Sequence, residues 1–171
     1  MVKDQGPKRR AAILYWTRFG NTEEVAKAIE QGLRESGMEI QLLKTEETAP
    51  ETLKGYDLIC VGGPTEKSGV NPPIREFLGL AGKAHLEGRL AFAFDTRYDS
   101  RFSGSAAKYI ENSLDDQGLR IVAKRASAIV TSTKEGGRPV GARLRRGEVE
   151  RFANLGSKIG AKTEEFLAIE A

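Results

Sequence analysis

Residues 15–23 read YWTRFGNTE and join an apolar run, AAIL, to a stretch with helical spacing, VAKAIEQGL. A helix that begins here presents free backbone N–H groups and a partial positive charge at its first turn, which suits a phosphate group. Thr17, Asn21 and Thr22 add hydroxyl and amide donors, and Gly20 lets the backbone pass close to a ligand. The junction predicts a phosphate site between a strand and a helix. Alternatively, Thr22 only caps the helix.

The loop differs from the two commoner phosphate-binding motifs. It lacks the Gly-Lys-Ser/Thr ending of the Walker A loop, and it also lacks the G-x-G-x-x-G of dinucleotide-binding loops. Because it contains no lysine, dipoles and hydrogen bonds would supply most of the attraction for a phosphate.

Apolar runs that fit strands alternate with helical spacing along the rest of the chain, in the order βαββαβαβα. We expect strands at 11–16, 39–43, 56–63, 88–95 and 120–132, the last interrupted near 125–127, and helices that begin near residues 21, 72, 106 and 147. This alternation predicts an α/β fold with a parallel sheet and helices on both faces. Residues 11–171 are expected to form one domain and residues 1–10 a flexible tail.

Two features near the end of the chain give more specific expectations. The spacing of the last helix predicts one buried face, made of Val149, Phe152, Leu155, Ile159 and Phe166. Residues 134–148, KEGGRPVGARLRRGE, are rich in glycine and arginine and are expected to form a basic loop. This loop is either solvated or docks an acidic redox partner, and it has no aromatic residues for stacking on nucleic acid.

Composition excludes several classes of function. The chain has 171 residues, a net charge of +3 and a pI of about 9.0, and no apolar run is long enough to cross a membrane. The single cysteine, Cys60, cannot form an internal disulfide. The single histidine, His85, has no ligand partners nearby in the sequence, so we expect neither a structural zinc site nor a Ser-His-Asp triad. We expect a cytoplasmic protein with neither a metal site nor a nucleic-acid partner.

In open α/β sheets, ligands bind beyond the carboxyl ends of the strands. The segments at this edge are 16–22, 63–73 and 95–104. With these segments in view, the sequence resembles the flavodoxins, over roughly residues 10–168. YWTRFGNTE is similar to their Y-W-S-x-T-G-N-T-E loop, which holds the 5′-phosphate of FMN, although Arg18 and Phe19 depart from that pattern.

The resemblance implies a three-layer sandwich with a five-stranded parallel sheet in the order 2-1-3-4-5. It also implies FMN contacts from three segments: Thr17, Arg18, Phe19, Gly20, Asn21, Thr22, Pro64, Thr65, Glu66, Lys67, Ser68, Gly69, Asp95, Thr96, Arg97 and Tyr98. Arg18 is expected to reach the phosphate, and Phe19 to pack on the core or cover the ribityl chain.

The second and third segments would surround the flavin ring. Pro64 and Thr65 stand where the family has Gly-x-Pro-Thr, and Ser68-Gly69 is a candidate backbone hinge beside flavin N5. Tyr98 is the candidate for stacking on the ring, or else a surface tyrosine. Asp95 is expected either to contact the cofactor or to pair with Arg97 and anchor its own loop.

Charge around the three segments bears on the chemistry. Four cations, Arg18, Lys67, Arg97 and Arg101, stand against three anions, Glu66, Asp95 and Asp99. A cation near the flavin favours its anionic reduced form, so the site should be less reducing than that of an acidic flavodoxin.

Three functions remain open on the sequence. The resemblance implies an electron carrier that uses FMN, with a redox partner protein or a small-molecule acceptor. The alternatives are an FMN-dependent NAD(P)H:quinone or small-metabolite oxidoreductase, and a flavin-free regulatory or binding module. We expect a monomer or a homodimer, and no separate catalytic residues.

Overall fold

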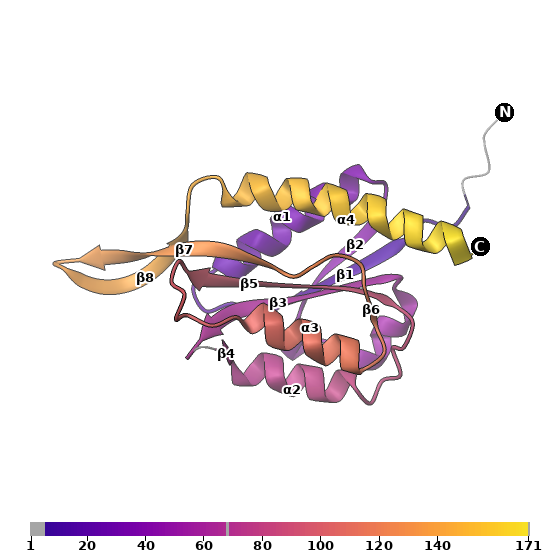
Figure 1. The fold of residues 1–171 in the computed structure, drawn as a ribbon, viewed down its shortest axis with the longest axis horizontal. Helices are drawn as coiled ribbons and strands as arrows, with labels where there is room; N and C mark the ends of the chain where they lie inside the picture. The colour runs from indigo at the N-terminus through magenta and orange to yellow at the C-terminus, as the bar shows by residue number, and fades with distance from the viewer. Residues whose placement is uncertain (1–5, 68, 171) are drawn as a thin grey trace.

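A mostly parallel sheet lies between two layers of helices in the computed structural model, which describes residues 6–67 and 69–170 (Figure 1). Its elements are β1 (Arg10–Tyr15), α1 (Asn21–Glu35), β2 (Glu39–Lys44), the 3-10 helices η1 (Thr45–Glu47) and η2 (Pro50–Gly55), β3 (Leu58–Glu66), β4 (Gly69–Val70), α2 (Pro72–Ala81), β5 (Leu90–Tyr98), α3 (Ala106–Asp116), β6 (Arg120–Ile121), β7 (Ala126–Glu135), β8 (Arg138–Leu144) and α4 (Glu148–Glu170).

The sheet has the order β2-β1-β3-β5-β7-β8. The pairs from β2 to β7 are parallel, so these five strands confirm the predicted order 2-1-3-4-5. Three additions complete the sheet: β4 pairs with β3, β6 pairs with β5, and β8 runs antiparallel to β7 at the edge. The interruption expected near residues 125–127 corresponds to the break between β6 and β7.

Each face of the sheet has its own core because successive residues on a strand point to opposite sides. Ile13 faces the layer of α1 and α4 and packs in a cluster with Phe94 and Phe152. Its neighbour Leu14 faces α2 and α3 and belongs to the cluster of Ile74. Figure 1 shows α1 and α4 above the sheet and α2 and α3 below it.

Close contact between α1 and α4 depends on glycines. A Cβ atom on Gly156 would lie 2.5 Å from the carbonyl oxygen of Ile29, and one on Gly32 would lie 2.1 Å from that of Ala153. Both obstacles are backbone atoms, which cannot rotate away. The two helices therefore approach as closely as their backbones allow.

The single cysteine lies in the middle of this structure. Cys60 on β3 is fully buried, and burial raises the pKa of its thiol to about 12. Because the thiolate is the reactive form, this side chain serves packing and not chemistry.

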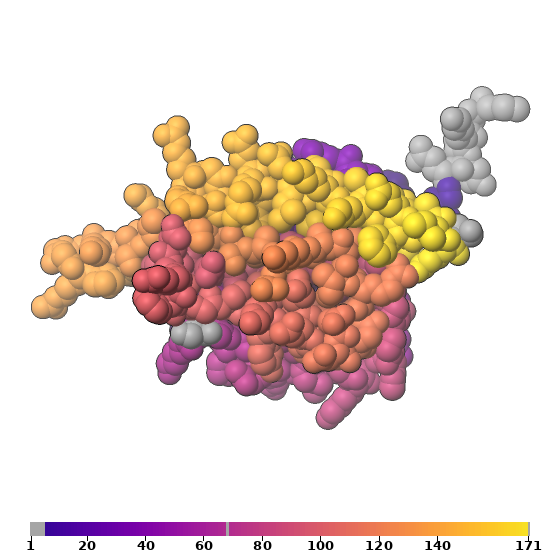
Figure 2. Space-filling model, viewed as in Figure 1, coloured from indigo at the N-terminus to yellow at the C-terminus, as the bar shows by residue number. Residues whose placement is uncertain are grey.

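The prediction that residues 134–148 form a loop is wrong. The segment forms most of a hairpin, in which β7 continues to Glu135 and β8 returns from Arg138. The turn between them is Gly136-Gly137, with φ of 55° and 79°, and two positive φ values in a two-residue turn match the right-handed twist of the strands. The hairpin projects from one end of the molecule (Figures 1 and 2).

The buried face of the last helix differs from the prediction at its start. Phe152 and Ile159 are buried as expected, but Val149 is 44% exposed and Glu148 is buried instead. The cause is a hydrogen bond, because the Glu148 carboxylate accepts from the backbone N–H of Ile129 and turns this residue toward the sheet.

Replacing Gly156 by alanine should lower the free energy of unfolding by about 1–3 kcal/mol, because the added methyl group meets backbone atoms of α1. Gly79 of α2 is a matched control, since a Cβ there meets nothing within 4 Å. Gly79→Ala should be neutral or stabilise by about 0.5–1 kcal/mol. Denaturant unfolding measures both, and an equal effect at the two positions would contradict the close contact.

Candidate functional site

A hollow lies at the carboxyl edge of the sheet, where the three predicted segments meet. Its volume is about 110 Å³, below the usual ~300–1,000 Å³ of enclosed ligand pockets, so a ligand here stays partly exposed. It is lined by Thr17, Arg18, Phe19, Asn21, Thr22, Pro64, Thr65, Glu66, Thr96, Arg97, Tyr98, Val130 and Ala142. All three segments therefore contribute to one site.

Some of the predicted residues lie beside this hollow rather than in its lining. Gly20 shapes the first loop, and Asp95 is buried behind the site. Lys67 follows the last residue of β3 and has a φ of 48°, and Gly69 is the first residue of β4. Ser68 lies outside the described residues, so the proposed backbone hinge stays a prediction.

The first loop is shaped for an anion. Gly20 adopts a left-handed conformation with φ of 90°, and its N–H donates to the hydroxyl oxygen of Thr17 at 2.9 Å. That hydroxyl keeps its own proton for a ligand. Helix α1 begins at Asn21, so the N–H groups of its first turn have no partner inside the helix.

Two side chains of this helix are already engaged. The Asn21 amide donates to the carbonyl oxygen of Ala142 on β8 at 2.8 Å, and the hydroxyls of Thr22 and Thr96 lie 3.1 Å apart. Thr22 is not the N-cap, because Gly20 holds that position. The Asn21 contact ties the hairpin to the loop 17–22.

Arg18 has a partner that the sequence did not predict. Its guanidinium forms a two-pronged ion pair with the Glu66 carboxylate, in which Nη2 donates to Oε2 at 2.9 Å, and it lies 5.1 Å from the centre of the Trp16 ring. The pair joins the loop after β1 to the end of β3. Two of the charges counted in the sequence therefore neutralise each other.

Asp95 anchors the start of α3. Its Oδ2 atom accepts from the hydroxyls of Thr65 and Ser105, at 3.0 and 2.9 Å, and from the N–H of Ala107 at 2.9 Å. Within the described part of the chain, Oδ1 is buried without a hydrogen-bond partner. The expected pair with Arg97 is wrong, because the free N–H groups of a helix N-terminus attract the carboxylate.

Arg97 instead holds the connection between β5 and α3. Its Nη1 atom donates to the Ser103 hydroxyl at 3.2 Å and to the Gly104 carbonyl at 3.1 Å. Both acceptors are neutral, so the positive charge of Arg97 remains at the hollow.

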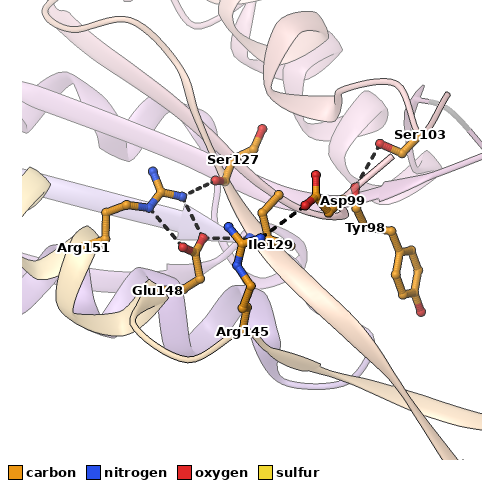
Figure 3. Close-up of polar contacts among 8 residues, drawn as sticks. All are labelled: Tyr98, Asp99, Ser103, Ser127, Ile129, Arg145, Glu148 and Arg151. Atoms are coloured by element: carbon orange, nitrogen blue, oxygen red, sulfur yellow. Dashed lines mark hydrogen bonds and ion pairs between the residues drawn. The ribbon is translucent and has the colours of Figure 1, made fainter. Parts of the chain in front are cut away.

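Exposed aromatic rings lie at the rim. Phe19 and Tyr98 are 60% and 44% exposed and both line the hollow, so Phe19 does not pack on the core. The Tyr98 ring points away from Glu148 and Arg151 at the start of α4 (Figure 3). The two rings come from the segments after β1 and at the end of β5, on either side of β3 in the sheet.

The hairpin supplies two lining residues that sequence reasoning missed. Val130 and Ala142 face the hollow from β7 and β8. The Gly136-Gly137 pair between two runs with β-branched residues was the available signal for a hairpin.

A charged cluster fixes the root of the hairpin (Figure 3). Glu148 binds Arg151, with Nη2 donating to Oε2 at 2.7 Å, and accepts from the N–H of Ile129 at 2.8 Å. Arg145 donates to the Asp99 carboxylate at 3.2 Å. Burial alone would raise the pKa of Glu148, but these bonds outweigh it and hold the pKa below its ordinary value.

Comparison with known proteins places this chain in a family. The flavodoxin sequence profile matches residues 13–153. The chain belongs to the flavodoxin family. The structural neighbours of this family member include an archaeal flavodoxin, with a TM-score of 0.73 and 20% identity over 91% of this chain and 99% of that one. At such identity, the likeness shows the fold alone.

Three curated relatives differ in their descriptions. The chain is 32% identical over 115 residues, 65% of its length, to a putative diflavin flavoprotein of Synechocystis, and 31% over 88 residues, 51% of its length, to a flavodoxin of Clostridium saccharobutylicum. It is 29% identical over 109 residues, 50% of its length, to an NAD(P)H dehydrogenase (quinone) of Caulobacter vibrioides. The chain spans 19% of the first relative and 55% of each of the other two.

Two further observations concern the described residues only. Their histidines, cysteines and acids form no group of three that could hold a metal ion. None of their helices combines the length and the apolar character needed to cross a membrane.

Glu148→Gln should reduce the free energy of unfolding by about 1–3 kcal/mol at pH 7, because it removes the charged partner of Arg151. Since the folded-state pKa of Glu148 is lowered, its contribution is complete above the unfolded pKa and is lost as the pH falls through the folded one. The difference between variant and wild type should therefore shrink on acidification below about pH 4. Chemical denaturation from pH 3 to 7 measures it.

Glu150→Gln is the control for this prediction. Glu150 is exposed and lies in the same helical turn. A pH-independent difference for Glu148→Gln, or an equal effect at Glu150, would show that the buried cluster is not the source.

Proposed function

We propose that this chain binds FMN at the hollow and transfers electrons through it. The observation that carries this proposal is the convergence of three strand ends, with the loop 17–22, Pro64-Thr65 and Tyr98 around one open site. When bound, FMN supplies a centre that takes up and releases electrons. The roles of the protein are to hold it, orient it and set its electrostatic surroundings.

The phosphate end would lie at the first turn of α1. The N–H groups there, the Thr17 hydroxyl and the Thr22 hydroxyl supply donors, and the helix dipole supplies a partial positive charge. Arg18 is held by Glu66, so we propose that it acts mainly by joining the two loops and not as a primary phosphate ligand.

The ring end would lie near the end of β3. Pro64 and Thr65 form the floor of the hollow there, and Phe19 and Tyr98 offer exposed aromatic faces at its rim. Aromatic rings stack favourably on one another when offset, which favours a planar flavin at this position. The Asp95 contact with Thr65 keeps that part of the floor in place.

Thr22→Val should weaken FMN binding about tenfold, because it removes a hydroxyl donor to a charged group while keeping the shape of the side chain. Thr131→Val, at an exposed position of β7, is the matched control and should leave the affinity unchanged. Titration of the apoprotein with FMN, followed by flavin fluorescence, measures both.

The same titration tests the whole proposal. A wild-type protein that takes up no FMN at micromolar concentration would rule out both the carrier and the flavin enzyme. The flavin-free module would then be the remaining function.

Arg97→Gln should lower the reduction potential of bound FMN, because it removes a positive charge that stabilises the anionic reduced flavin. Each 1.4 kcal/mol of lost stabilisation lowers a one-electron potential by about 59 mV. Arg97→Lys keeps the charge and should keep most of the potential. Redox titration of the holoprotein measures the potential of the wild type and of the two variants. Equal potentials would show that the charge of Arg97 does not act on the flavin.

A second candidate is an FMN-dependent NAD(P)H:quinone oxidoreductase. The match to the dehydrogenase of Caulobacter vibrioides and the positive charge of Arg97 favour it. Oxidation of NADH or NADPH by the holoprotein with a quinone acceptor distinguishes this enzyme from a carrier.

The electron carrier would need a redox partner protein. The β7–β8 hairpin stands beside the hollow and carries exposed arginines, among them Arg138 and Arg143. Such a surface favours an acidic partner that docks close to the flavin.

A further inference from the structure

A second concave site lies next to the hollow and is lined mainly by cations. This basic groove has a volume of about 330 Å³ and is formed by Arg97, Arg101, Gly104, Ser105, Lys108, Lys124, Arg125 and Ser127. The residues come from the end of β5, the connection after it, the first turn of α3, the segment before β7 and the start of β7. In Figure 1 the chain between β6 and β7 runs past α3 at this place.

Most of the positive charge in the basic groove is not neutralised by acids. Arg125 forms an ion pair with Glu111 at 2.9 Å, and the nearby Asp99 pairs with Arg145. The other four cations of the groove are Arg97, Arg101, Lys108 and Lys124, and none of them makes an ion pair with a carboxylate of residues 6–67 or 69–170. Like charges gathered in a concavity repel one another unless an anion lies between them.

The helix N-terminus is not the source of binding in this groove. The N–H groups of Ala106, Ala107 and Lys108 already donate to the side chains of Thr65, Asp95 and Ser105. An anion would therefore be held by guanidinium and ammonium groups. These are the groups that recognise phosphate oxygens, the arginines in a two-pronged geometry and the lysines as point charges.

Arg97 connects the basic groove to the hollow, since it lines both. Its Nη1 atom is satisfied by neutral oxygens, whereas its Nε donor is buried and has no acceptor in the described part of the chain. A ligand in the groove thus begins one side chain away from the proposed flavin. The two sites share this side chain, so one small molecule can contact both.

We propose that the basic groove binds the phosphate groups of a small organic phosphate of the nucleotide class, distinct from FMN. The volume lies within the range of small-molecule sites, about 300–1,000 Å³. A phosphate carries up to two negative charges on closely spaced oxygens, which matches several cations in one concavity better than single carboxylates do. The phosphate of FMN would remain at the loop 17–22.

The test is a titration of the ¹⁵N-labelled protein with inorganic pyrophosphate and with ADP, in the presence of saturating FMN. Saturable amide shifts should appear at residues 104–108 and 124–127. The variant Lys108→Gln/Lys124→Gln should weaken binding about fivefold for each lost charge, while Lys83→Gln, at an exposed lysine outside the groove, should change nothing. FMN affinity should be the same in all three proteins.

The outcomes separate the sources of the phosphate. Tighter binding of ADP than of pyrophosphate supports a nucleotide, and equal binding shows that the phosphates alone are recognised. Shifts confined to residues 17–22, or none that saturate, would overturn the proposal. Saturable shifts from an acidic peptide but not from pyrophosphate would also overturn it, in favour of protein docking. Failure of FMN binding would contradict the proposed function. It would not contradict this site, which the titrations with pyrophosphate and ADP test separately.

Discussion

Parallel pairing of β2, β1, β3, β5 and β7 is the constraint on which the rest of this structure depends. A parallel strand can be followed by another only if the chain returns across a face of the sheet. The returning helices then begin at the edge where the strands end, and their positive dipole ends gather there. The candidate site lies at this edge for that reason. Segments that are far apart in the sequence, after β1, β3 and β5, meet there.

Local contacts at this edge decide how the charges act. A count of charges in the sequence gives a nearly balanced site, but the structure pairs them unevenly. Glu66 neutralises Arg18, Asp99 neutralises Arg145, and Asp95 is turned toward the start of α3. Arg97 is left with neutral acceptors, so a modest net charge becomes a positive field on one side of the hollow.

The sequence was sufficient for the fold and for the segments that line the hollow. Periodicity predicts the alternation of strands and helices, and the resemblance to the flavodoxins, which begins with the motif in residues 15–23, implies the strand order. The partners of individual side chains were not predictable. The pair of Arg18 with Glu66 joins residues 48 positions apart, and it depends on how two loops lie after folding. The hairpin at residues 126–144 was missed for a different reason: glycine and proline indicate a loop in general, whereas Gly136-Gly137 makes a tight turn and Pro139 is tolerated on an edge strand.

The glycine contact between α1 and α4 has a consequence for the order in which this protein becomes functional. The loop 17–22 leads into α1, and α1 is held in place by α4, which follows it in the chain only after β8. Contacts between distant parts of a chain form late, because the intervening segment must first be ordered. During translation, α1 and the loop 17–22 before it are therefore not fixed in place until α4 has emerged from the ribosome. An ordered loop at residues 17–22 therefore indicates that the segment from α1 to α4 has already packed together.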